Sequence, residues 1–258
     1  MPTPFIEVVD RLFIRMDELV PAALYPDHVL QIPGRINGTA FFPGGSGLYL
    51  EERDRNLVEF PFGGAMILGH NFDSEFGFQN SLQRGKEKLT SGTWRSMIGL
   101  LEAADVPLKD CFFTNAFMGL CEGGNSFEYR GRDDKRFRTA CLLFLKAQIA
   151  LQHPRLIVTL GLHVPPLLAL ISPGLSAWSG PRLHLKDIDK APIFFRVGIE
   201  SSTGSTHEAN VVAIAHPSLP NSRKRQPLKF SPGRSGEIEL IRAGWNRSTS
   251  LMRSASLE

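Results

Sequence analysis

The chain has few cysteines, little excess charge and no nucleotide-binding motif, and each shortage excludes a class of protein. Its three cysteines, Cys111, Cys121 and Cys141, show no CxxC spacing, which argues against a disulfide framework or a four-cysteine metal site. The 29 Lys and Arg residues exceed the 26 Asp and Glu residues by only +3, too little to indicate a polyanionic partner. Neither a Walker pattern nor a GxGxxG after a strand occurs in the glycine-rich segments, so a nucleotide-phosphate cradle is not predicted.

Long apolar segments are also missing near the start of the chain. Residues 1–4 lead into a stretch that carries Glu7, Asp10 and Arg11, unlike the apolar segment of a signal peptide or a membrane helix. We therefore expect a monomeric protein of the reducing cytoplasm with no membrane partner.

The composition favours a globular protein with one main domain. Apolar residues make up 42% and charged residues 21% of the 258 residues, enough to bury a full core. Apolar residues at helical spacing from Phe5 to Leu24 predict an amphipathic opening helix that packs on the main domain. We expect a helical extension over 1–40, an α/β domain over 41–250 and a C-terminal tail over 251–258.

Short apolar runs alternate with helical patterns in the main domain. Four runs predict buried strands, at Ala65–Leu68, Cys111–Thr114, Leu156–Leu160 and Val211–Ala215. Helical spacing predicts helices over Thr93–Ala104 and Lys135–Gln152. This alternation predicts a three-layer α/β/α fold with a central, four-stranded, mainly parallel sheet.

Polar residues follow each predicted strand. Asn71 follows the first, Asn115 the second, Gly161 and His163 the third, and His216 the last. Ligands of parallel sheets gather at the carboxyl ends of the strands. We therefore expect these residues to converge on one site.

The order of these motifs resembles that of the uracil-DNA glycosylase superfamily. Four segments carry the resemblance: Met66 to Asn71, Phe113 to Ala116, Arg155 to Gly161, and Ala215 to Ser218. The resemblance implies the uracil-DNA glycosylase fold and a DNA glycosylase of base excision repair. Such an enzyme flips uracil or another deaminated base from the stack and hydrolyses its N-glycosidic bond, without a metal or organic cofactor.

The resemblance also implies roles for individual residues at the split site. The amide of Asn115 reads the flipped base, which Gly69 and His70 also contact, because an amide offers both a donor and an acceptor. His216 donates to the base carbonyl that gathers negative charge. Asn71 positions the water, and Asp73 is a candidate to orient that water or stabilise the sugar cation.

Two further features distinguish the chain within this resemblance. The first motif ends in Phe72-Asp73, where the family usually has proline followed by Gly, Tyr or Ala. Phe78, or alternatively Phe76, takes the place of the aromatic ring that stacks on the base. Family branches with an iron-sulfur cluster need four cysteines, so the three present predict no cluster.

The segment after His216 is the most basic part of the chain. By resemblance, Leu219 is the wedge that enters the duplex, next to Ser218, and the cations hold backbone phosphates. The DNA-binding set is therefore Ser218, Leu219, Arg223, Lys224 and Arg225. Affinity for DNA should then fall steeply with salt.

Other interpretations remain open from the residues alone. Asp73 could cap a helix over the residues that follow it, Phe76 and Phe78 could belong to the core, and the basic run could be a solvated turn. The unusual end of the first motif favours a protein that binds nucleic acid without chemistry. A third alternative is an enzyme of the same fold that acts on a nucleoside or another small molecule.

Overall fold

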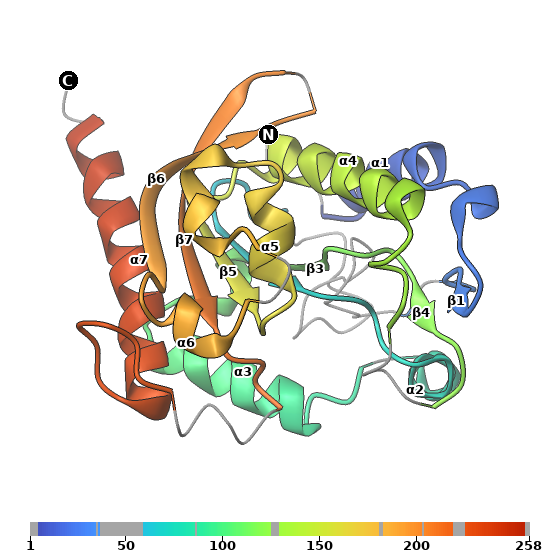
Figure 1. Cartoon of the computed structure of the whole chain (residues 1–258), viewed down its shortest axis with the longest axis horizontal. Coiled ribbons are helices and arrows are strands. Elements are labelled where there is room, and N and C mark those ends of the chain that lie inside the picture. The colour runs from blue at the N-terminus through green and yellow to red at the C-terminus, as the bar shows by residue number, and fades with distance from the viewer. Residues whose placement is uncertain are drawn as a thin grey trace.

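A mixed five-stranded sheet flanked by helices forms the centre of the protein (Figure 1). The computed structural model describes residues 5–34, 36, 59–85, 87–124, 129–180, 183–202, 204–218 and 225–255. The strands of the sheet, in spatial order, are β3 (Cys111–Asn115), β2 (Ala65–Gly69), β5 (Leu156–Leu160), β7 (Thr206–Ile214) and β6 (Ile193–Glu200). The first four are parallel to one another, and β6 is antiparallel to β7.

The expectation of a four-stranded sheet is therefore wrong by one strand. All four predicted strands form, but β6 adds an antiparallel edge. Buried and exposed residues do not alternate regularly along β6, and its pairing with β7 is irregular between Phe194 and Val197. The period-two pattern that signals a half-buried strand is thus interrupted in the middle of β6.

The helices and short elements complete the described part of the chain. The α-helices are α1 (Phe5–Leu19), α2 (Glu75–Arg84), α3 (Gly92–Ala103), α4 (Lys135–Gln152), α5 (Val164–Ala169), α6 (Leu185–Ile188) and α7 (Gly233–Ala255). The 3-10 helices are η1 (Ala22–Leu24), η3 (Leu108–Asp110) and η5 (Pro173–Trp178). A small antiparallel pair joins β1 (Val29–Leu30) to β4 (Leu120–Cys121).

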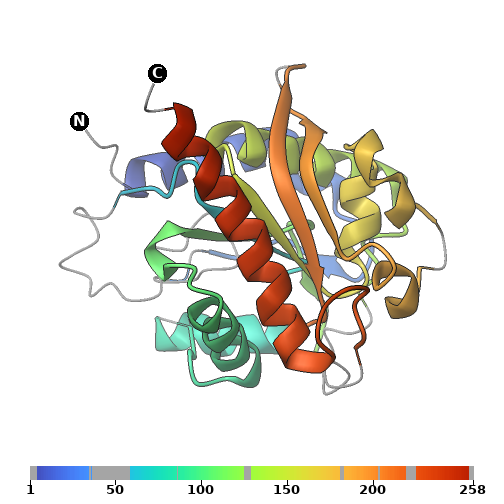
Figure 2. The same ribbon diagram turned by 90° about the vertical axis from the view of Figure 1, so that its left-hand side faces the viewer.

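Both faces of the sheet are covered, because successive side chains of each strand point to opposite sides. In β2, Met66 and Leu68 belong to a core shared with α1, α4 and α5. Ala65 and Ile67 belong to a second core shared with α3 and α7. Figure 2 shows α7 lying across one face of the sheet, with α4 on the other side. This arrangement explains why the strands read as continuous apolar runs.

The opening helix packs on the sheet domain. Val8, Val9, Leu12 and Met16 of α1 are buried in the same core as α4. The helix ends at Leu19, earlier than expected from the apolar spacing, since Pro21 cannot continue the backbone hydrogen bonds of a helix.

The two predicted helices of the main domain form within one residue of their expected ends. The α4 helix matches its prediction, because the Asp134 carboxylate accepts from Phe137 N at 2.7 Å and His153 ends the helix in a left-handed conformation. The α7 helix continues to Ala255, so residues 251–255 of the expected tail are helical. Among the described residues, no helix combines the length and the apolar character needed to cross a bilayer.

The outer edge of β6 is shaped by a backbone irregularity. Arg196 has a φ of 52° within the strand. The Asn210 side chain of β7 accepts from Arg196 N at 3.0 Å and donates to Gly244 O of α7 at 2.8 Å. One buried amide therefore ties this bulge to the helix behind the sheet.

Candidate functional site

The segments after the parallel strands meet at one edge of the sheet. Gly69 of β2 is the register partner of Asn115 of β3, and Phe117 N donates to His70 O at 2.9 Å. Gly161 N, after β5, donates to Ile214 O of β7 at 2.9 Å. The predicted convergence of the strand ends is thus present in the backbone.

Gly161 lets the last two strand ends approach closely. It has a φ of 81°, and a Cβ at this position would lie 3.3 Å from the Cβ of His216. A Cβ would therefore be crowded against His216, and residues other than glycine rarely adopt this positive φ. The glycine after the third strand therefore makes room for the histidine after the fourth.

His70 lies within a group of imidazole and cationic side chains. Its ring centroid is 5.2 Å from that of His163. Burial is the main cause that lowers the pKa of His70 to about 3, with smaller contributions from His163, Arg132 and His216. The segments after β2, β5 and β7 therefore each bring one histidine to the same neighbourhood, and His70 is neutral near pH 7.

The neutral His70 ring orients Asn71. His70 Nδ1 lies 2.9 Å from Asn71 Oδ1. Because an amide oxygen only accepts, His70 Nδ1 carries the proton in this arrangement. The second lone pair of Asn71 Oδ1 remains able to accept a proton from a water molecule.

Ser218 fixes the tautomer of His216. Ser218 N donates to His216 Nδ1 at 3.4 Å, and Ser218 Oγ lies 2.7 Å from the same nitrogen. Burial lowers the pKa of His216 below its usual value, so the ring is neutral near pH 7. With Nδ1 as the acceptor, the proton sits on Nε2, which becomes a hydrogen-bond donor.

Asn115 is a deeply buried member of the predicted site. It is 1% exposed at the last position of β3. Its neighbour Thr114 points to the other side of the strand and donates to Gln148 of α4 at 2.6 Å. The position of Asn115 next to Gly69 fits an amide held rigidly at the edge of the sheet.

Three residues of this neighbourhood carried little or no sequence signal. Arg132 Nη1 lies 3.2 Å from His163 Nδ1, and the ring of buried Tyr129 is 5.4 Å from that of His70. His163 could be found from its place after the third strand. Arg132 and Tyr129 lie in the loop before α4 and follow no strand, so no pattern in the sequence identified them.

Asp73 interacts with the start of α2. Its Oδ1 accepts from Ser74 N at 2.7 Å, and its carboxylate packs against Gly77 so closely that a Cβ there would clash. Ser74, rather than Asp73, caps the helix by accepting from Gly77 N at 3.2 Å. Although Asp73 is exposed, partial desolvation raises the pKa of its carboxyl. The hydrogen bond from Ser74 N offsets part of this cost to the ionised carboxylate.

The expected stacking role of Phe78 is corrected by its position. Phe78 is 4% exposed and packs with Ile36 and Leu120 in a small separate core. A ring enclosed in this way presents no face to a base. Phe76, the alternative, is 56% exposed on the same helix, because the helical period turns it away from Phe78.

The predicted DNA-binding segment is only partly described. Leu219, Arg223 and Lys224 lie outside the described residues, whereas Ser218 is exposed beside His216. Arg225 corrects the prediction of a phosphate contact, because its guanidinium is fully buried and its Nε donates to Asp189 Oδ1 at 2.6 Å. A cation enclosed with carboxylates presents no donor to DNA.

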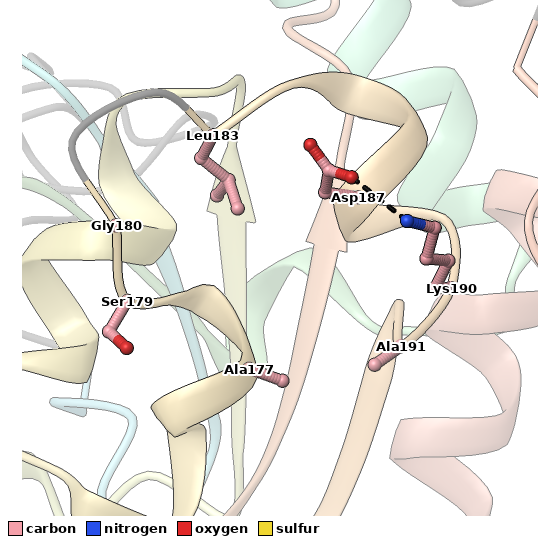
Figure 3. A pocket seen from close by; sticks show the side chains of 7 residues that line it. All are labelled: Ala177, Ser179, Gly180, Leu183, Asp187, Lys190 and Ala191. Carbon is pink, nitrogen blue, oxygen red and sulfur yellow. Dashed lines mark hydrogen bonds and ion pairs between the residues drawn. The ribbon is translucent and has the colours of Figure 1, made fainter.

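An open cavity lies between η5 and α6 (Figure 3). Its lining consists mainly of small and apolar side chains, together with an ion pair between Lys190 Nζ and Asp187 Oδ1 at 3.1 Å. None of the predicted site residues that the structure describes lines this cavity. Within the described ranges, no group of three His, Cys, Asp or Glu side chains could hold a metal ion.

Comparison with known proteins adds no family to this description. The sequence matches no protein-family model, and no curated protein is significantly similar to it.

Proposed function

We propose that the protein is a DNA glycosylase that hydrolyses the N-glycosidic bond of uracil or another deaminated base. The observation that carries the proposal is the meeting of the β2, β3, β5 and β7 ends, with Asn115 in register beside Gly69 and with Gly161 packed next to His216. An amide, a histidine donor and a second amide near one sheet edge are the groups that this reaction needs.

His216 supplies the electrophilic part of the proposed reaction. As the C–N bond breaks, the base leaves as an anion whose charge gathers on its carbonyl oxygen and ring nitrogen. The Nε2–H of neutral His216, fixed by the contacts of Ser218 with Nδ1, donates to this oxygen. A preorganised donor of this kind stabilises a developing anion by about 3–4 kcal/mol.

Asn71 supplies the water-binding part. Its Oδ1 accepts from His70 and from the attacking water, whose oxygen adds to the sugar carbon. The water loses a proton, and the departing base anion takes one up from solvent, so atoms and charges balance. Because an amide is a weak base, the proposal implies slow hydrolysis that relies on leaving-group stabilisation.

Asn115 supplies base recognition. Its buried amide offers one donor and one acceptor, which match the polar edge of a flipped base. A bidentate contact of this kind discriminates between bases by about 1–3 kcal/mol. Deamination changes this pattern relative to the parent base, since uracil differs from cytosine and hypoxanthine from adenine at the donor and acceptor positions of that edge.

The proposal is tested with oligonucleotides that contain a single uracil, hypoxanthine or xanthine. Excess protein should release the base, and alkali should then cleave the strand at the abasic site. The Asn115→Ala and His216→Ala variants should lose most of this activity, while His28→Ala, in an exposed ion pair with Glu122, should retain it. Intact strands with all three bases would overturn the proposal.

A protein that binds nucleic acid without chemistry is the second candidate function. The position of Asp73 favours it, since its carboxylate is engaged by Ser74 N at the start of α2 rather than directed as a general base. Salt-sensitive binding of a uracil-containing oligonucleotide, with no base release, would support this function instead.

A further inference from the structure

A buried carboxylate on α7 holds the backbone next to His216. Glu237 is 2% exposed, and its Oε1 accepts from Ala215 N at 2.8 Å. Ala215 follows the last residue of β7 and directly precedes His216. The amide that donates this bond therefore lies where the chain leaves the sheet and turns into the candidate site.

The same carboxylate oxygen also faces Arg225. Arg225 Nη1 lies 3.5 Å from Glu237 Oε1, and its Nε donates to Asp189 Oδ1. Asp189 Oδ2 further accepts from Gln226 N at 3.3 Å. Glu237 thus contacts the chain on both sides of residues 216–224, at Ala215 and at Arg225.

Stability alone does not account for this arrangement. A buried ion pair often contributes no more to stability than apolar side chains of similar volume, because both charges must leave water. Here the carboxylate accepts its shortest hydrogen bond from one backbone amide. That amide belongs to the residue before His216, whose ring must keep one orientation for the proposed reaction. Buried hydrogen-bonding side chains of this kind can hold in place the residues around a reactive side chain.

We propose that Glu237 is a positioning residue for His216: its carboxylate holds the Ala215 amide and faces Arg225, which Asp189 holds in place, and the imidazole thereby keeps its position at the strand ends. The effect on catalysis rests on the proposed function. The effect on the position of the His216 ring does not.

Two substitutions separate the hydrogen bond from the charge. Glu237→Gln keeps an oxygen acceptor of the same reach and removes the charge that faces Arg225. Glu237→Asp keeps the charge and withdraws the oxygen from Ala215 N by one methylene. Glu239→Asp is the matched control, because Glu239 lies on the same helix and binds Ser231 instead.

The position of the ring is measured by NMR of the imidazole nitrogens in the ¹⁵N-labelled full chain. In Glu237→Asp, the His216 signals should shift, and the pKa of His216, now lowered by burial, should rise toward 6.5 as the ring gains solvent. Base release should fall about tenfold to a hundredfold in kcat with little change in KM. Glu237→Gln and Glu239→Asp should stay close to wild type in all three measurements.

The outcomes separate the position of the ring from the reaction. If Glu237→Asp shifts His216 while the wild-type protein releases no base, the positioning role stands and the proposed function fails. If the wild type is active and Glu237→Asp leaves both the His216 signals and kcat unchanged, the positioning role is overturned. The same holds if Glu237→Gln disturbs His216 while Glu237→Asp does not, because the charge and not the hydrogen bond to Ala215 N would then matter.

A measurement on the wild-type protein guards against a variant that does not fold. The Ala215 amide should exchange with solvent deuterium as slowly as that of Ala213, which donates to Pro192 O within the described fold. Exchange at the rate of an exposed amide would mean that Glu237 does not hold Ala215, and would overturn the inference.

Discussion

The segment after β2 and the segment after β7 meet at the same edge of the sheet, but different forces hold them. Residues 69–73 are held mainly by backbone hydrogen bonds to the segment from Phe117 to Cys121. His70 O accepts from Phe117 N, and the amides of Phe72 and Cys121 also donate hydrogen bonds between these two segments. Residues 215–218 are bound by side chains, through Glu237 to Ala215 N and through Ser218 to His216. Substitutions should therefore disturb the second segment more readily than the first.

The largest expected loss of activity comes from the segment after β7. His216→Ala removes the Nε2–H donor, and base release should fall about 10²- to 10³-fold. Single-turnover assays with a uracil-containing oligonucleotide measure this rate. Thermal unfolding should remain close to wild type, since the half-buried His216 ring bonds to Ser218 of its own loop. A rate within about twofold of wild type would remove His216 from the reaction.

The segment after β2 should respond in the opposite direction to one substitution. Asn71→Asp introduces a carboxylate that can take the proton of the attacking water, and general-base catalysis contributes about 10²- to 10⁴-fold. Base release should therefore rise in the same assay. Asn71→Leu, which has similar volume and no acceptor, is the control and should lose activity. Equal rates in both variants would show that no water is bound at Asn71.

Acid should lower the free energy of unfolding, because buried histidines lie where the two segments meet. Burial lowers the folded-state pKa values of His70 and His216 below 6.5. Below that pH the unfolded chain binds more protons, so the free energy of unfolding falls as the pH drops from about 6.5 toward the folded pKa, about 3 for His70.

Urea unfolding at about pH 7 and about pH 4.5 measures this loss. His70→Gln should reduce the pH-dependent loss by at least about 1 kcal/mol, because one pKa unit corresponds to about 1.4 kcal/mol. His28→Gln, at an exposed position, is the control. Identical pH dependence in His70→Gln and the wild type would mean that His70 is not buried as described.

The smallest effect is expected at Asp73. Asp73→Asn keeps an oxygen that can accept from Ser74 N and removes a charge that desolvation disfavours, so the free energy of unfolding should change by less than about 1 kcal/mol. Base release should change by less than about twofold, since the carboxylate bonds to Ser74 N. Kinetics and chemical denaturation on one preparation test both parts. A loss of activity comparable to that of His216→Ala would restore the catalytic role that the sequence predicts for Asp73.

The parallel part of the sheet could be predicted because its signal is local. Ala65–Gly69 and Leu156–Leu160 are short apolar runs that end in glycine, and each forms a buried strand. The β6 strand could not be predicted in the same way, since its irregular pairing depends on Asn210 and Gly244, which are distant in sequence. The order of the parallel strands could therefore be predicted from periodicity, whereas the edge strand β6 could not.

The candidate site was predictable only where it follows a strand directly. Asn71, Asn115, His163 and His216 all follow strands, so the topology brings their segments to one edge. Arg225 reads as a solvent-facing member of a basic run, but its buried position depends on Asp189 and Glu237. A run of like charges carries no information about which member turns inward to meet a carboxylate.

The bulge of β6 has a consequence for how the molecule behaves at high concentration. Sheet edges with regular, unpaired backbone groups can recruit further strands and start aggregation. At this edge Arg196, with its left-handed backbone, breaks the regular repeat, and its charged side chain pairs with Glu208 at 3.1 Å on the surface. The amide of Asn210 therefore helps to protect against self-association, and its replacement by Ala should increase light scattering during refolding.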